Sequence, residues 1–154
     1  MSFDKAFDTI FEVEDGYVND TQDPGGETKY GISKRAYPSL DIANLTIDQA
    51  KDIYRRDYWA QVKGDFLPWP LCLFVFDAAV NQGVEPAVKM LQKALGCAQD
   101  GIAGADTVKR AQAATPWHMA KFMALRALRY QGTRNFDRFG EGWLTRTYLV
   151  AMEA

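Results

Sequence analysis

Residues 70–83 have the sequence Pro70-Leu71-Cys72-Leu73-Phe74-Val75-Phe76-Asp77-Ala78-Ala79-Val80-Asn81-Gln82-Gly83. A proline at the first turn and a glycine just past the end are typical of helix boundaries. Apolar side chains between them occupy nearly every face of the predicted helix, which indicates burial on all sides. Residues 70–83 are therefore expected to form a central helix on which the other helices pack.

Other helices and one small β element are expected around this central helix. Phe3, Phe7, Ile10, Phe11 and Glu14 recur at the spacing of one helix face. Turn residues at 25–26 separate two short β-like segments, 17–18 and 28–30, which predicts a hairpin directly after the first helix. Further helices are predicted over about 46–58, 85–95, 115–132 and 141–151, with a short one capped by Asp106. The sequence thus predicts a mainly α protein: a helical bundle with a small N-terminal β-hairpin.

Composition excludes several classes of function. The chain has 154 residues, a net charge of -2 and a pI of about 5.4, so no basic nucleic-acid-binding surface is expected. His118 is the only histidine, which argues against a zinc site built from several His ligands. The two cysteines, Cys72 and Cys97, lie among apolar residues and are expected to be buried free thiols. We expect no metal and no cofactor.

Targeting features are also not evident in the sequence. The first residues lack the basic and apolar regions of a secretion signal, and no apolar run is long enough to span a bilayer. The expectation is therefore synthesis and folding in the cytoplasm, as a monomer without stable membrane insertion.

Glu14 is the strongest candidate for a catalytic group. It lies close to three helical turns after Phe3, so its side chain is expected on the aromatic face of the first helix. Partial burial there would raise the pKa of its carboxyl group, as a general acid near neutral pH requires. The alternative is a glutamate that turns to solvent at a helix end, and periodicity alone does not decide between the two.

The loop after this helix supplies candidate partners for the acid. A general acid often works with a second carboxylate or polar group across the bond that breaks, as is usual in glycosidic hydrolysis, and a hairpin could place Asp23 or Thr28 opposite Glu14. Aspartates readily make side-chain turns, so a purely structural role for Asp23 stays open. Tyr30, beside the loop, is expected to contact the substrate.

The central helix carries polar residues near its end. Asp77 and Asn81 lie four residues apart and so share one face. The neighbours of Asp77 are all apolar, which favours a structural role in which other groups satisfy its carboxylate. Asn81 and Gln82, nearer the helix end, are expected to line a cleft and bind substrate.

Residues 14–20 and 23–33, Glu-Asp-Gly-Tyr-Val-Asn-Asp and Asp-Pro-Gly-Gly-Glu-Thr-Lys-Tyr-Gly-Ile-Ser, resemble the signature of glycoside hydrolase family 108. That family contains phage and prophage lysozyme-like endolysins. Further matches lie at 50, 53–54, 57–59, 76–79 and 81–83. The second half is similar to the family's associated peptidoglycan-binding segment, at 91–92, 95–96, 100–101, 104 and 107, and residues 139–140 and 142–146 resemble the family's ending.

Two details depart from the patterns. Position 15 is Asp where the family has Gly. The order Glu14, Asp23, Thr28 also resembles the Glu, Asp, Thr arrangement of phage lysozymes, but its last gap differs by one residue, which puts the role of Thr28 in doubt.

The resemblance implies an α+β lysozyme-like fold whose hairpin lies beside a catalytic helix. It implies a catalytic segment at 1–83 and a helical peptidoglycan-binding-like segment at 84–154, forming one compact unit. The implied activity is hydrolysis of the β-1,4 bond between N-acetylmuramic acid and N-acetylglucosamine in peptidoglycan, with Glu14, Asp23 and Thr28 as catalytic residues. Such a bacteriolytic endolysin would act in the periplasm or wall after a holin-type partner permeabilises the membrane. A lytic transglycosylase and a non-catalytic wall-binding phage protein are the alternatives.

Overall fold

The computed structural model describes residues 2–11, 17–19 and 26–154. Its α-helices are α1 (Ser2–Phe11), α2 (Ile47–Tyr54), α3 (Leu71–Gln82), α4 (Val84–Leu95), α5 (Ala105–Gln112), α6 (Pro116–Gln131) and α7 (Phe136–Met152). The strands are β1 (Tyr17–Asn19), β2 (Glu27–Lys29) and β3 (Ile32–Ser33), and two short helical segments are η1 (Arg55–Trp59) and η2 (Gly64–Phe66). The expected mainly α architecture with a small N-terminal β element is confirmed.

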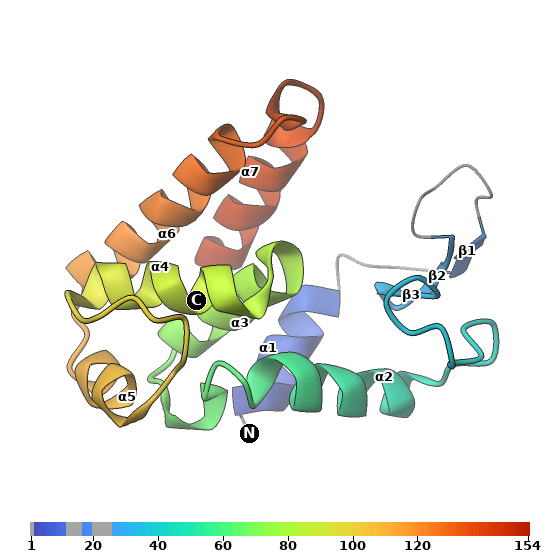
Figure 1. Ribbon diagram of the computed structural model, residues 1–154, viewed down its shortest axis with the longest axis horizontal. Coiled ribbons are helices and arrows are strands. Elements are labelled where there is room, and N and C mark those ends of the chain that lie inside the picture. Colours follow the sequence, from blue (N-terminus) through green and yellow to red (C-terminus); the bar gives the residue numbers. More distant parts are fainter. Residues whose placement is uncertain (1, 12–16, 20–25) are drawn as a thin grey trace.

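Helix α3 lies at the centre of the molecule, as its composition predicts. Residues 71–79 are all buried, and α3 contacts α1, α4, α6, α7, η1 and η2 (Figure 1). A single cluster of buried apolar residues includes Phe3 and Phe76 together with Leu91 and Phe122, so both halves of the chain contribute to it. Burial of this one helix therefore holds the helical layers together.

Helix α1 packs its aromatic face on the central layer. Phe3, Phe7 and Ile10 are buried, as the periodicity predicts. The rings of Phe3 and Phe76 lie 5.6 and 5.4 Å from the ring of Trp59, both edge-on. Trp59 is the last residue of η1, a single wide π-helical turn that follows α2. The sequence had predicted an α-helix as far as about Tyr58. The wide turn places the Trp59 indole in the core, and this packing outweighs the regular hydrogen-bond pattern.

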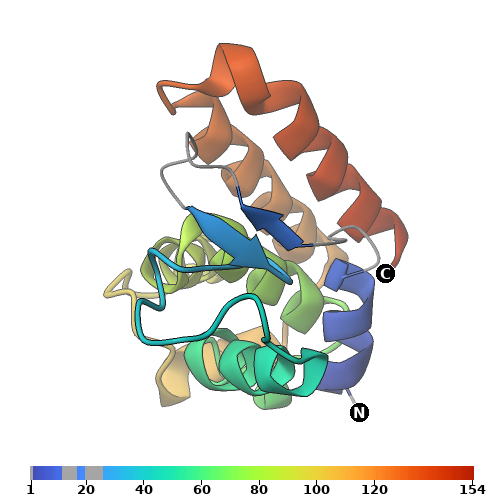
Figure 2. The ribbon, with the colours of Figure 1, turned by 90° about the vertical axis from the view of Figure 1, so that its right-hand side faces the viewer.

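The β element is a three-stranded antiparallel sheet in the order β1-β2-β3, at one end of the molecule (Figures 1 and 2). The expected pairing of β1 with β2 is confirmed, with Val18 opposite Thr28. Strand β3 was not expected, because two residues give no alternation to recognise. The β2–β3 turn has left-handed conformations at Tyr30 (φ 51°) and Gly31 (φ 72°), and β3 places Ser33 opposite Thr28.

Helix ends follow local sequence signals in most places. Thr46 and Gln49 form the expected capping box at α2. The prediction for α5 was wrong in detail: Gly104 precedes the helix and Asp106 lies within its first turn, paired with Arg110. Helix α7 begins at Phe136 rather than near 141, because packing overrides the low helix propensity of the glycines in its first turns.

A hydrogen-bonded loop joins α4 to α5. Buried Gln92 donates from Nε2 to Asp100 Oδ1 (2.8 Å) and Ile102 O (3.0 Å), and its Oε1 accepts from the Gly101 amide (3.0 Å). Thr107 Oγ1 lies 3.1 Å from the same Nε2. Several residues that carry the second-half family resemblance therefore form one structural unit.

Two glycines should respond to alanine with opposite signs. A Cβ at Gly64 would lie 2.3 Å from the Trp59 ring, whereas a Cβ at Gly142, exposed within α7, would meet nothing within 4 Å. Gly64→Ala should lower the free energy of unfolding by about 1–3 kcal/mol through overpacking. Gly142→Ala should raise it by up to about 1 kcal/mol. Urea unfolding monitored by tryptophan fluorescence measures both, and equal effects would contradict the packing described for Trp59.

Candidate active site

A cavity of about 250 Å³ lies where the sheet meets the ends of α1, α2 and α3 and the middle of α7. Its lining residues are Ile10, Phe11, Thr28, Gly31, Tyr54, Val80, Asn81 and Arg146. Some of these residues are apolar or aromatic, and others carry a hydroxyl, an amide and a guanidinium. This mixture is typical of sites that hold a ligand by packing and orient it by a few polar contacts.

Larger hollows exist elsewhere in the described part of the chain. One of about 380 Å³ between α6 and α7 is lined by apolar residues such as Phe74 and Met123, and one of about 690 Å³ lies between α4 and α6. Neither contains a residue that the sequence assigns to the site. We therefore identify the site by its chemistry rather than by its volume.

Thr28 and Asn81, which the sequence assigns to the site from segments far apart, both line this cavity. Thr28 belongs to the central strand β2, and its hydroxyl donates to the Gly26 carbonyl at 3.3 Å. Asn81 is at the end of α3, and its Nδ2 donates to the Asp77 carbonyl (2.7 Å) and Oδ1 (3.2 Å). That arrangement fixes the Asn81 amide with its oxygen available as an acceptor.

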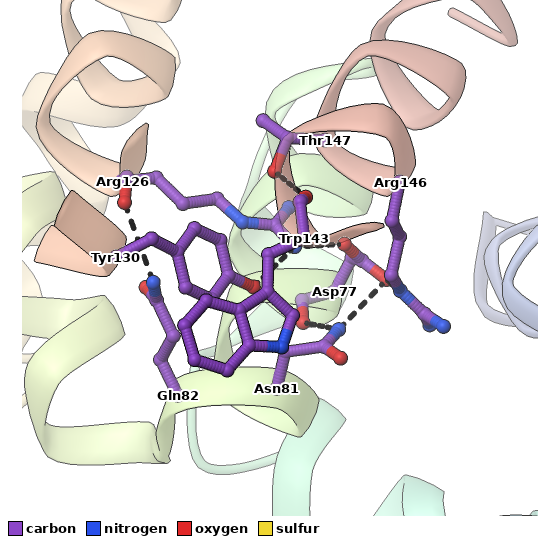
Figure 3. A network of polar contacts seen from close by, with 8 residues as sticks. All are labelled: Asp77, Asn81, Gln82, Arg126, Tyr130, Trp143, Arg146 and Thr147. Atoms are coloured by element: carbon purple, nitrogen blue, oxygen red, sulfur yellow. Dashed lines mark hydrogen bonds and ion pairs between the residues drawn. The ribbon is translucent and has the colours of Figure 1, made fainter. Parts of the chain in front are cut away.

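Tyr30 and Gln82 do not line the cavity. The Tyr30 ring is half-buried against the core, and its carbonyl accepts a hydrogen bond from the Tyr54 hydroxyl at 2.9 Å. Gln82 points toward α6, where its Nε2 donates to the Arg126 carbonyl at 3.3 Å (Figure 3). Tyr54 was not singled out by sequence reasoning, yet it both lines the cavity and holds the β2–β3 turn.

Glu14 and Asp23 lie outside the described residues, as does Asp15. In the sequence, the described residues nearest to Glu14 are Phe11, at the end of α1, and Tyr17, at the start of β1. Phe11, the last residue of α1, is part of the cavity wall.

A buried ion network contacts two of the lining residues, Asn81 and Arg146 (Figure 3). Asp77 is fully buried, and its Oδ2 lies 2.5 Å from Arg126 Nη2, an ion pair without the geometry of a directed hydrogen bond. Its Oδ1 accepts from Arg146 Nη2 (2.9 Å) and Nε (3.1 Å). The structural role expected of Asp77 is confirmed by these contacts. Sequence reasoning did not identify Arg126 and Arg146 as partners of Asp77. The one signal was the expected burial of Asp77, because a buried carboxylate requires a cation or several donors.

Other chemistries find no support in the described residues. Burial raises the pKa of the Cys72 thiol to about 11, so it is not a thiolate nucleophile at neutral pH. His118 closes the capping box of α6, where its Nδ1 accepts from the Thr115 amide at 3.0 Å. Cys72 and Cys97 are both free. Within the described ranges, no group of His, Cys, Asp and Glu is arranged to hold a metal ion, and no helix is long and apolar enough to cross a membrane.

Comparison with known proteins places this site in a family context. The model of the family described as glycosyl hydrolase 108 matches residues 7–83, half of the 154-residue chain. The structure of Brucella abortus SagA is similar to this one with a TM-score of 0.87 and 34% sequence identity, covering 98% of this chain and 92% of that one. No curated protein matches the chain. On the combined evidence of sequence and fold, the chain belongs to the glycosyl hydrolase 108 family and is a lysozyme-like glycoside hydrolase.

Proposed function

We propose that this protein is a muramidase that hydrolyses the β-1,4 bond between N-acetylmuramic acid and N-acetylglucosamine, and that it serves as a phage or prophage endolysin. The observation that carries the proposal is the cavity that Thr28, Asn81 and Phe11 all line. Glu14 follows Phe11 by three residues, and three residues of chain span at most about 11 Å. A glycoside hydrolase family match over residues 7–83 includes all of these positions.

In the proposed reaction, Glu14 protonates the oxygen of the leaving sugar as the glycosidic bond breaks. Positive charge develops on the sugar ring, and Asp23, together with Thr28, stabilises that charge or orients the attacking water. The water oxygen bonds to the anomeric carbon and its proton passes to a carboxylate. No cofactor takes part in these steps.

The remaining proposed contacts bind the sugars. Asn81 offers a fixed amide at the cavity wall. Tyr30 lies in the turn adjoining the cavity, where a sugar face can pack on its half-buried ring. Gln82 would act only by exchanging its hydrogen bond to the Arg126 carbonyl for one to substrate.

Glu14→Gln tests the acid. The amide keeps the size of the side chain but cannot donate the proton, so turnover should fall by about 10²–10⁴ while binding to insoluble wall persists. Release of soluble fragments from purified peptidoglycan measures turnover, and co-sedimentation measures binding. Asp23→Asn should also lose activity, to a lesser degree because neighbours can hold a water.

High residual turnover in the Glu14→Gln variant would contradict the assignment of Glu14 as the acid. A folded Glu14→Gln variant that keeps more than about a tenth of wild-type turnover would remove Glu14 as the general acid. Asp8→Asn, an exposed carboxylate on α1, is the matched control and should leave turnover unchanged.

Mass spectrometry of the products distinguishes hydrolysis from its closest alternative. A hydrolase adds water and leaves a reducing muramic acid end, whereas a lytic transglycosylase closes a 1,6-anhydro ring and gives a product lighter by one water. We expect reducing ends only. Anhydro products would show transglycosylation, and wall binding without released fragments would show a binding protein.

Access to the wall is part of the same proposal. An endolysin that depends on a holin-type partner should leave host cells intact when expressed alone. Co-expression with a membrane-permeabilising protein should cause rapid loss of culture turbidity. Lysis at the same rate without permeabilisation would contradict this dependence.

A further inference from the structure

Three aromatic side chains form a row where α6 meets α7. The rings of Tyr130 and Trp143 are stacked, with their centroids 5.1 Å apart and their planes inclined by 22°. Phe139 lies one turn before Trp143 on α7, and its ring centroid is 5.8 Å from that of Trp143. None of the three is among the described lining residues of the cavity, and the reaction proposed above does not use them.

The row begins one helical turn from the cavity. Arg146, which lines the cavity, follows Trp143 by three residues, so both lie on one side of α7. Phe139, Trp143 and Arg146 have the spacing i, i+4 and i+7, which places them in a line along that side. Figure 3 shows the Trp143 indole at the end of α3 that carries Asn81 and Gln82. The aromatic row is therefore a continuation of the cavity along α7.

The three rings differ in their exposure to solvent. Tyr130 is buried, and its hydroxyl accepts a hydrogen bond from Arg126 Nη2 at 3.2 Å. Arg126 is in turn held by the ion pair with Asp77. Phe139 is 43% exposed, and Trp143 is partly exposed. Because Tyr130 covers one face of the Trp143 indole from the protein interior, the exposed part of the indole lies on the side away from Tyr130.

Packing within the protein accounts for Tyr130 but not for the exposure of the two outer rings. A ring that stays in water gains little of the free energy that burial provides. Neighbouring apolar side chains that remain exposed together often mark a binding surface. The Trp143 indole N–H also donates to none of the described residues, so the edge of this surface carries a hydrogen-bond donor.

We propose that Trp143 and Phe139 form a platform on which a sugar ring of the glycan strand packs, next to the sugars that occupy the cavity. The proposal rests on the proposed muramidase function and adds a further sugar-binding position to it. A polymer that is cut within its length must continue past the cavity over the protein surface, and the aromatic row leads away from the cavity. The faces of a pyranose ring carry C–H groups that pack on aromatic rings, while its oxygens accept from a donor such as the indole N–H.

The test measures KM and kcat on glycan strands from amidase-treated peptidoglycan, which carry no stem peptides. Trp143→Leu removes the aromatic face, so KM should rise about tenfold while kcat changes little, because a contact remote from the bond is made equally in the ground and transition states. Trp143→Phe keeps a smaller ring and should give an intermediate KM. Trp117→Leu is the matched control and should behave as wild type, because Trp117 is exposed at the other end of α6 from Tyr130.

Phe139→Leu separates sugar binding from packing. The Phe139 side chain is exposed, so this change leaves Trp143 stacked on Tyr130 and the fold intact. KM should still rise, by about threefold. A rise in KM for Trp143→Leu alone, with a matching loss of stability in urea, would overturn the proposal by showing that Trp143 only packs against Tyr130.

Tryptophan fluorescence measures the contact without turnover. In a Glu14→Gln background, the same stem-free strands should change the emission, and Trp143→Phe should remove most of that change while Trp117→Leu keeps it. An unaltered change in Trp143→Phe, or a KM within about twofold of wild type in folded Trp143→Leu, would overturn the platform. If wild type releases no fragments but the change that depends on Trp143 persists, the proposed function fails while the platform stands.

Discussion

The carboxylate of Asp77 has no contact with solvent, and its two oxygens are shared between α6 and α7. Removing either guanidinium leaves a buried charge with fewer partners, a change that is strongly destabilising in protein interiors. The requirement to neutralise Asp77 therefore fixes where α7 lies relative to α3. Both helices contribute lining residues to the cavity, so the shape of the site depends on the same ion network.

Local signals were sufficient for most of the helices. The apolar stretch at 71–79, the aromatic periodicity of α1 and the capping box at Thr46 each encode their structure within a few residues. The pairing of β1 with β2 was predictable for the same reason, because the glycine-containing turn and the short β-like segments are adjacent. The lysozyme-like fold and the glycoside hydrolase chemistry were predicted from the family motif at 14–20 and 23–33. Periodicity indicates secondary structure but does not indicate an activity.

Long-range features were not predictable in the same way. Arg146 lies 69 residues from Asp77, and nothing near either residue specifies the other. The wide turn at η1 depends on the space available for Trp59, and β3 is too short to have a pattern. Of the predicted site residues, Thr28 and Asn81 share the cavity, whereas Tyr30 and Gln82 are held by backbone contacts outside it. The direction in which these side chains point depends on tertiary packing, which cannot be predicted from residue type.

The sequence separation between α3 and α7 has a consequence during translation. A nascent chain that has emerged only through Gly83 contains Asp77 but neither of its arginines, and it lacks Arg146, which α7 contributes to the cavity. Domains generally fold as units while the chain grows from its N-terminus. The ribosome must therefore add residues through at least Arg146 before this cavity has all of its described lining residues. Any activity that depends on the complete cavity is therefore absent from chains that end before α7.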